Sequence, residues 1–430
     1  MMSLPYKQFA FQDYRFDEAE KKLTFIYCFD NKLELVETYK FDFEFVPFDS
    51  KILQRAIENL FFMAGISYYK MYVPQNILIN KGVLDQHTAT FFNKTYQKGL
   101  GEFWYKNKLS PNYSINFPVN ATISQNHKIQ SITKGLLVGI GGGKDSLVSI
   151  ELLRNNIDSL TTWSLNHRTR LSPLIERIGL PHLWVERTLD SKIFELNQQG
   201  ALNGHIPISA ILACVGIVVA ILSGNRDVVV SNEYSANEST LIYQGESINH
   251  QYSKTQEFEQ DYQDLLLDHF GETYRYYSIL RPFSELRIAE IFAKIAFDKY
   301  IDVFSSCNRA YTLNSNKISW CGECAKCAFT FLVLTPFVER EKLESLWAGK
   351  NLLLDPSLNS TFNKLLGIDT EKPLECVGEI RESRVAMTLA QQQYLELLQY
   401  HYDTPSNYNY RSMQPANMPP EIYKKLISLA

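Results

Sequence analysis

One stretch, Gly135–Leu153, reads GLLVGIGGGKDSLVSIELL and determines the fold class. Its first half is an apolar run, which predicts a buried strand, and its second half has apolar residues at helical spacing. The three glycines Gly141–Gly143 join the two halves. Glycines at such a junction let the backbone approach an anion, and the first N–H groups of the helix then point at it. With Lys144 and Ser146 as further donors, the stretch predicts a phosphate-binding loop.

Two well-known phosphate loops do not fit this sequence. A P-loop fails because Val138 holds the place of its first glycine and Asp145 follows Lys144. A dinucleotide fingerprint fails because Lys144 occupies the place of its third glycine. The loop instead resembles the PP-loop of the ATP pyrophosphatases, Ser-Gly-Gly-x-Asp-Ser, with Gly141 in place of the first serine.

That resemblance implies an α/β fold, a doubly wound parallel sheet of the HUP-like type. It also implies cleavage of ATP between the α- and β-phosphates, with transfer of AMP to a carboxylate or carbonyl oxygen. Asp145 would lie near Mg²⁺, because a carboxylate beside a triphosphate requires a cation between them. The residues implied in ATP binding are Gly141, Gly142, Gly143, Lys144, Asp145 and Ser146.

The composition and charge of the chain exclude several classes of protein. The chain has 430 residues, 45% of them hydrophobic, and a net charge of −4 without a basic stripe, which argues against nucleic-acid partners. The N-terminal residues lack the apolar core of a signal peptide, so we expect a cytoplasmic protein. Ile206–Leu222 is almost wholly apolar, but it is short for a membrane span and contains Pro207. A buried crossover helix is the better interpretation, and no membrane partner is expected.

Three regions are predicted. Residues 1–130 form an aromatic-rich α+β domain, assigned to substrate recognition; residues 131–345 form the ATP pyrophosphatase domain; and residues 346–430 form a mostly helical extension. In the central region, apolar strands alternate with helices, which predicts a parallel sheet with ligands at the carboxyl ends of its strands. The predicted strands are Leu136–Ile140, Leu160–Leu165, Leu183–Glu186 and Val228–Ser231.

Four of the seven cysteines lie close together in the sequence, at Cys307, Cys321, Cys324 and Cys327. Thiolates on a tight turn, closed by one from a nearby loop, hold tetrahedral Zn²⁺, so a structural zinc site is predicted. A redox pair or unliganded buried thiols are the alternatives. The 7-cyano-7-deazaguanine synthases, which are PP-loop enzymes, have a similar cluster.

Polar residues follow the predicted strands and mark a candidate site. His205 precedes the apolar helix, where the helix dipole would keep its ring neutral, and Glu233 directly follows a strand. His250 lies in a dense group of donors. The residues assigned to the substrate are Asn232, Lys254, Arg281, Arg287 and Arg309.

Together these motifs resemble the UDP-N-acetylmuramoyl-L-alanyl-L-glutamate epimerase family. The resemblance implies inversion of the terminal L-Glu of UDP-MurNAc-L-Ala-L-Glu to D-Glu for peptidoglycan synthesis. It also implies use of ATP and Mg²⁺, with AMP and pyrophosphate as products, and a functional link to the ligase that adds L-Glu to UDP-MurNAc-L-Ala. The motifs are Gly141–Ser146, Asn203–Ile208, Ser231–Asn237, Asn249–Lys254, Arg281–Arg287, Ser306–Arg309, Cys321–Leu332 and Lys372–Gly378.

The sequence leaves the α-proton base open among Glu233, His205, His250 and Cys376. His250 and Glu233 are preferred, and a thiol such as Cys376 serves only if its pKa is lowered. Removal of the α-proton from the acyl adenylate itself, or from an oxazolone formed with the L-Ala carbonyl, is equally open. The alternative functions are a nitrile synthase or amide ligase of the PP-loop type, a tRNA-modifying adenylating enzyme, and a non-catalytic ATP-binding module.

Overall fold

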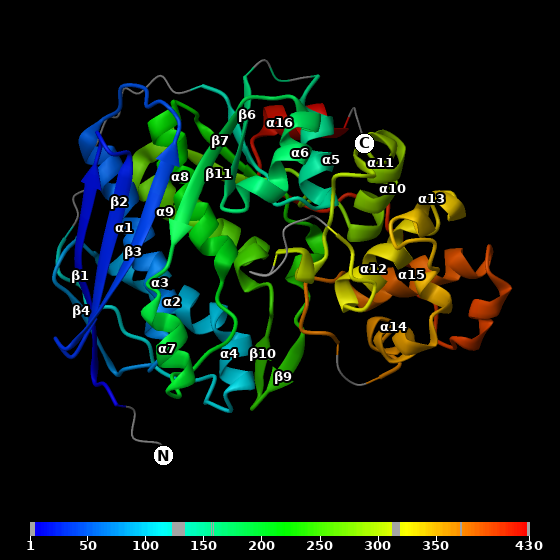
Figure 1. Ribbon diagram of the computed structural model, residues 1–430, viewed down its shortest axis with the longest axis horizontal. Coiled ribbons are helices and arrows are strands. Elements are labelled where there is room, and N and C mark those ends of the chain that lie inside the picture. Colours follow the sequence, from blue (N-terminus) through cyan, green and yellow to red (C-terminus); the bar gives the residue numbers. More distant parts are fainter. Residues whose placement is uncertain are drawn as a thin grey trace.

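The computed structural model describes residues 5–122, 134–155, 157, 159–311, 319–369 and 372–427 (Figure 1). A nine-stranded sheet with the order β11-β8-β5-β6-β7-β3-β2-β1-β4 forms its centre. The strands of this sheet are β1 (Gln8–Asp17), β2 (Lys22–Phe29), β3 (Leu33–Asp42), β4 (Asn76–Ile79), β5 (Leu136–Gly139), β6 (Leu160–Leu165), β7 (His182–Thr188), β8 (Asp227–Val230) and β11 (Arg275–Ser278). A small hairpin consists of β9 (Leu241–Tyr243) and β10 (Glu246–Ile248).

Helices surround this sheet and extend beyond it. In the first half of the chain they are α1 (Ser50–Ala64), α2 (Ile66–Tyr69), α3 (Gln86–Gly99), α4 (Gly101–Lys106), α5 (Lys144–Leu153), α6 (Arg168–Ile178), α7 (Lys192–Gln198) and α8 (Ile208–Ser223). In the second half they are α9 (Gln256–Phe270), α10 (Glu285–Ile295), α11 (Phe297–Tyr300), α12 (Ala325–Leu334), α13 (Arg340–Ser345), α14 (Asn359–Leu365), α15 (Ile380–Gln391) and α16 (Pro420–Ile427).

The five strands β11, β8, β5, β6 and β7 pair in parallel. β5 is the first of them in the chain, and its two neighbours continue the sheet in opposite directions, so the strand order reverses between β5 and β8. In open α/β sheets, ligands bind in the crevice at this switch point. Neighbouring residues of β5 face opposite sides: Leu137 belongs to the core beneath α1 and α8, and Val138 to the core beneath α5 and α10. The expected α/β class, with helices on both faces, is therefore confirmed, while the HUP-like type stays a prediction.

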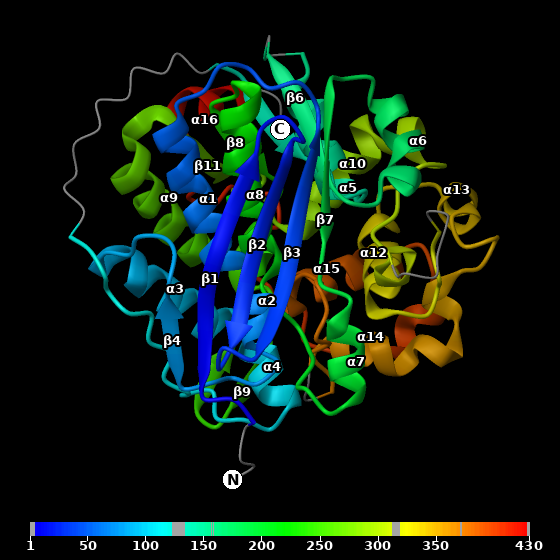
Figure 2. The ribbon, with the colours of Figure 1, turned by 60° about the vertical axis from the view of Figure 1, so that its left-hand side comes forward.

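The N-terminal strands continue the same sheet. β3 pairs antiparallel with β7, and β2 and β1 follow it, as Figure 2 shows. One sheet therefore crosses the predicted boundary at residue 130. The N-terminal region contributes four strands to the central sheet. The division of the chain into three regions stays a prediction.

The apolar helix α8 lies between the sheet and α1. Gly216 permits the close packing, because a Cβ there would come within 2.7 Å of a methyl carbon of Val228. Over the described residues, no helix is long and apolar enough to cross a membrane. The crossover-helix interpretation of this segment agrees with its buried position.

Beyond α12 the regular elements of the described residues are helices joined by irregular segments, and α12, α14 and α15 pack together at one end of the molecule (Figure 1). The last helix, α16, returns to the edge of the sheet. Its Glu421 pairs with Arg275 of β11 at 3.0 Å.

Candidate active site

The glycine loop lies at the carboxyl end of β5, beside the switch point. Gly142 has a φ of +92°, a backbone conformation that side chains rarely adopt, and the Ser305 N–H donates to its carbonyl oxygen at 3.0 Å. A Cβ on Gly143 would meet the Ser306 hydroxyl at 2.8 Å, whereas a Cβ on Gly141 would meet nothing within 4 Å. The loop is therefore held by the segment at 305–306 and has open space at its first glycine.

Three carboxylates gather beside this loop. Asp145 lies in the first turn of α5, Glu233 follows β8, and Glu285 is the first residue of α10. One oxygen of each lies within 4.8 Å of the others. Glu233 and Glu285 are almost wholly buried, so this acidic cluster (Asp145, Glu233 and Glu285) is a concentration of negative charge that requires cations nearby.

Lysines supply part of the compensating charge. The buried Lys144 ammonium donates to Asp145 and Glu285, and Lys326 of α12 lies 3.6 Å from the second oxygen of Glu285. Burial acts to raise the pKa of Glu285, but Lys144 and Lys326 lower it to about 2. For Glu233, burial and then Glu285 raise the pKa. In the described part of the chain, no hydrogen bond is made to the Glu233 carboxylate, so this group lacks a partner of its own.

Arg281 forms hydrogen bonds with the segments that surround the acidic cluster. Its side chain is fully buried, and its guanidinium donates to the Glu233 carbonyl oxygen at 2.7 Å, to the Lys254 carbonyl oxygen at 2.6 Å and to Glu259 at 2.8 Å. These bonds join the segments that carry two other candidate residues. Arg281 therefore stabilises the segments of the site, and its side chain has no exposed surface with which to contact a substrate.

A second group of ionisable side chains comes from four separate segments. His250 Nδ1 contacts the carboxylate of Glu102 on α4, and the rings of His250 and His205 have centroids 4.4 Å apart. The Lys254 ammonium lies 3.5 Å from the Cys376 sulfur, and His250 is near enough to the same thiol to affect its pKa. We call these five residues the thiol cluster.

The environment sets the charges of the thiol cluster. Burial and then His250 lower the pKa of His205 to about 4, so this ring is neutral at pH 7. Burial opposes protonation of His250, but Cys376 and Glu102 raise its pKa to about 9. Burial opposes ionisation of Cys376, but Lys254 and His250 lower its pKa to about 7. A thiolate beside an ammonium and an imidazolium is the state favoured near neutral pH.

The four cysteines predicted as metal ligands come together, with one sulfur of each within 4.8 Å of the others. Cys307 and Cys324 have sulfurs 4.0 Å apart, and Cys321 and Cys327 have sulfurs 3.7 Å apart. A tetrahedral zinc with Zn–S bonds of about 2.3 Å requires sulfur separations of roughly 3.8 Å. The four side chains therefore fit the zinc that their spacing suggests.

The other predicted substrate residues lie in different surroundings. Asn232 is buried beside the acidic cluster, where its N–H donates to the Ser278 hydroxyl at 2.8 Å. Arg287 pairs with Glu290 at 2.6 Å; because it is two residues beyond Glu285 on α10, it projects to the opposite side of the helix. Arg309 pairs with the exposed Glu323. Neither arginine has a described contact with the acidic or thiol cluster.

Four ionisable residues of the site escaped the sequence analysis: Glu102, Glu285, Lys326 and Glu382. Glu285 and Lys326 lie inside motifs that were singled out for an arginine and for cysteines. Glu382 is buried on α15 and accepts from Ser235, and burial and then Glu379 raise its pKa to about 8. Glu102 carries no local signal, since it lies far along the chain from either histidine.

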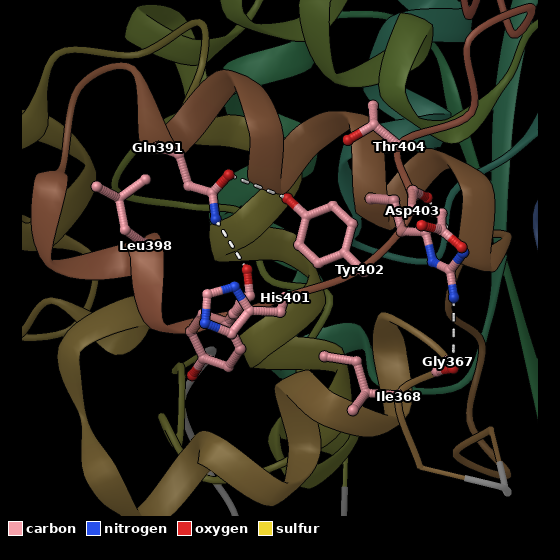
Figure 3. Close-up of a pocket in the computed structure, with 10 residues that line it drawn as sticks. Gly367, Ile368, Gln391, Leu398, His401, Tyr402, Asp403 and Thr404 are labelled. Carbon is pink, nitrogen blue, oxygen red and sulfur yellow. Dashed lines mark hydrogen bonds between the residues drawn. The ribbon is translucent and has the colours of Figure 1, made fainter.

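A further pocket of about 810 Å³ lies in the C-terminal region (Figure 3). Arg384 lines it, but its guanidinium donates to the carbonyl oxygens of Leu366, Gly367 and Asp403. None of the predicted site residues lines this pocket. The candidate active site is therefore the region of the glycine loop and the two clusters.

A mostly parallel α/β sheet with a glycine loop and buried ionisable groups at its switch point defines a protein of the α/β class with a candidate active site at that point. Comparison with known families gives two matches, the MurL N-terminal domain over residues 2–279 and the MurL C-terminal domain over residues 303–397. The chain therefore belongs to the MurL family.

Curated relatives agree with this assignment. The chain is 42% identical to a protein of Xanthomonas oryzae over 85% of this chain and 82% of that protein. It is 36% identical to a protein of Salinispora tropica, over 90% and 85% of the two chains. A Micromonospora protein is 38% identical over 81% and 77%. Each is named UDP-N-acetyl-alpha-D-muramoyl-L-alanyl-L-glutamate epimerase.

Proposed function

We propose that this protein inverts the terminal L-Glu of UDP-MurNAc-L-Ala-L-Glu to D-Glu, with ATP converted to AMP and pyrophosphate. The observation that carries the proposal is the meeting of the glycine loop with Asp145, Glu233 and Glu285 at the switch point of the sheet. The names of the relatives support the substrate. A reaction that consumes ATP and a nucleotide-linked dipeptide is expected in the cytoplasm, downstream of a ligase that joins L-Glu to UDP-MurNAc-L-Ala.

Adenylation explains why ATP is needed for an inversion. The α-proton of glutamate is weakly acidic beside a free carboxylate, because its removal would place two negative charges next to each other. Transfer of AMP to that carboxylate removes its charge, and the α-proton then becomes acidic enough for a side-chain base. Hydrolysis of the adenylate after reprotonation releases AMP and makes the inversion directional.

The acidic cluster fits magnesium. Three carboxylate oxygens within 4.8 Å of one another are ligands that Mg²⁺ accepts, and burial, followed by the charge of Glu285, raises the pKa of Glu233. Bound Mg²⁺ would offset the charge of the triphosphate at this position. The chain itself supplies the Gly141–Gly143 backbone donors and Lys144, which orient the nucleotide, while Arg281 fixes the Glu233 backbone.

We also propose a structural zinc held by Cys307, Cys321, Cys324 and Cys327. The sulfur separations support it, and four protein ligands leave no open position for catalysis. The site would fix the start of α12, whose Lys326 reaches Glu285. Metal analysis of protein purified without chelators should give one zinc per chain. A zinc content near zero in folded, active protein would contradict this site.

The test of the proposed function is a single incubation of the protein with ATP, Mg²⁺ and UDP-MurNAc-L-Ala-L-Glu. Chiral analysis of glutamate after acid hydrolysis should show D-Glu, with AMP and pyrophosphate formed alongside. Asp145→Asn should abolish both products, whereas Glu58→Gln, a buried carboxylate of α1 outside the site, serves as the matched control. Formation of AMP without D-Glu would contradict the epimerase function and would favour a PP-loop ligase or nitrile synthase. Absence of both products would contradict the proposal.

A further inference from the structure

The segment that carries Cys376 is fastened next to the glycine loop and the acidic cluster. The Glu375 carboxylate accepts from the Lys326 N–H at 2.9 Å and from Asn308 at 3.0 Å. On the other side, a Cβ on Gly378 would come within 3.2 Å of the Glu285 Cβ. Cys376 is thereby held close to the place where the adenylated carboxylate would form.

The sulfur of Cys376 faces two cations from one other segment, residues 249–254. Lys254 lies 3.5 Å away, and His250 is the second cation that acts on the thiol. Because His250 Nδ1 is engaged by Glu102, the other ring nitrogen is the one available to the sulfur. Glu375 directs its carboxylate to Asn308 and the Lys326 backbone. The residue Cys376 as a whole is half-buried.

We infer that the Cys376 thiolate is the base that removes the α-proton of the adenylated glutamate, with Lys254 holding the thiolate and the Glu102–His250 pair positioning it. The inference rests on the proposed function and adds the identity of its base. In this step the α-carbon–hydrogen bond breaks and a sulfur–hydrogen bond forms. The electron pair of the broken bond passes into the adenylated carbonyl group. A proton that derives from water then reaches the opposite face of the carbon.

The other candidate bases are less suitable in this structure. Glu233 belongs to the acidic cluster that would hold Mg²⁺, so its carboxylate oxygens would bind the metal ion and would not accept the α-proton. His250 is an imidazolium near pH 7, because the carboxylate and the thiol stabilise its charge, and an imidazolium cannot accept a proton. His205 is neutral but weakly basic, since burial disfavours its charged form. Among the four candidates, Cys376 is the one whose basic, anionic form is stabilised by adjacent cations.

The decisive experiment separates adenylation from proton removal. Wild type and Cys376→Ala are incubated in deuterated buffer with substrate, ATP and Mg²⁺, and we follow AMP, D-Glu and deuterium at the α-carbon. Cys376→Ala should lose deuterium incorporation and D-Glu by about 100-fold or more, while AMP release stays within a few-fold of wild type. Incorporation at the wild-type rate in Cys376→Ala would overturn the inference. A wild type that forms neither AMP nor D-Glu would instead overturn the proposed function.

Alkylation of Cys376 by iodoacetamide, followed by mass spectrometry of its peptide, tests the thiolate independently of turnover. In wild type the rate should rise with pH through about 7. Lys254→Met should move this midpoint upward by roughly one to three units, since an adjacent cation is lost. Lys98→Met removes a more exposed ammonium paired with Glu257 and is the matched control. An unchanged midpoint in Lys254→Met would contradict the role of Lys254.

Discussion

Two buried charge networks lie in the same sheet and differ in how completely they are compensated. At the junction of β3 and β7, Arg187 donates to Glu37 at 2.7 Å and to the Ser67 hydroxyl at 2.8 Å, and Tyr39 donates to the same carboxylate at 2.6 Å. One cation faces one anion. At the ends of β5 and β8, three carboxylates share Lys144 and Lys326, and Glu233 has no described hydrogen bond of its own.

This difference in charge compensation distinguishes a structural ion pair from a candidate binding site. A pair such as Arg187 and Glu37 balances its charge within the protein, so it joins the N-terminal strands to the parallel sheet without the need for a bound ion. In the acidic cluster, by contrast, three carboxyl groups lie together beside a glycine loop with open space at Gly141, and no hydrogen bond to the Glu233 carboxyl is found among the described residues. We expect a bound cation and a phosphate ligand to stabilise that arrangement. The following predictions test the contrast.

The largest effect is expected for Glu233→Gln. The substitution should lower kcat for AMP formation by about 100- to 1,000-fold, because a ligand for the cation that offsets charge is lost. The free energy of unfolding should stay the same or rise, since burial and Glu285 already raise the pKa of this carboxyl. Rates of AMP release and urea unfolding curves measure the two quantities. A clear loss of unfolding free energy together with full activity would show that Glu233 has a structural role instead of a role in AMP formation.

Arg187→Met should show the opposite behaviour. Removal of the guanidinium leaves Glu37 buried without its cation, at a cost of about 3–5 kcal/mol in unfolding free energy. The folded fraction should retain its kcat, because the pair lies away from the glycine loop. Denaturation followed by activity of the folded fraction provides the measurement. The double variant Arg187→Met/Glu37→Gln is the control, and it should recover part of the loss.

Glu382→Gln should change how stability depends on pH. The folded-state pKa of Glu382 is raised to about 8, so the group is protonated in the folded protein and ionises more easily when unfolded. Its contribution to stability is therefore fully present below about pH 4.5 and is lost as pH rises toward 8. Relative to wild type, the variant should gain on the order of a few kcal/mol at pH 8 and little at pH 5. Equal differences at both pH values would show that the carboxyl is ionised in the fold.

The smallest effect is expected for Gly141→Ser, which introduces the serine of the PP-loop pattern. A Cβ there meets no atom within 4 Å, so the unfolding free energy should change by less than about 0.5 kcal/mol. Gly142→Ala is the contrasting variant, because its φ of +92° makes any side chain strained, at a cost of about 1 kcal/mol or more. Thermal unfolding of both variants compares the two positions. Equal losses would contradict the open space at the first glycine.

Much of the central fold followed from local patterns. The predicted strand at 160–165 coincides with β6, and those starting at 136, 183 and 228 differ from β5, β7 and β8 by one or two residues at their ends. Buried parallel strands are continuous apolar runs, which is why they are readily recognised. β11 was missed, since Arg275–Ser278 is short and begins with a charged residue. The continuation of the sheet through β3 was also missed, because the pairing of Tyr39 with Arg187 has no local signature.

The site was predicted in part for a similar reason. The glycine loop, Glu233 and the four cysteines are local signals, and the structure brings each group to a cluster. Arg281 has the expected position but a different environment, since its guanidinium is wholly taken up by protein acceptors. Glu102 joins His250 only through the fold.

The sequence by itself determined the α/β class, the position of the glycine loop and the set of four neighbouring cysteines, because hydrophobic period, glycines and cysteine spacing act over short stretches of chain. Only the tertiary structure decided which charges meet. Glu285 reaches Lys144, and Cys376 reaches Lys254, through the packing of separate helices and loops around the switch point. Electrostatic interactions depend on distance in space and on burial, and neither quantity is written in the order of the residues.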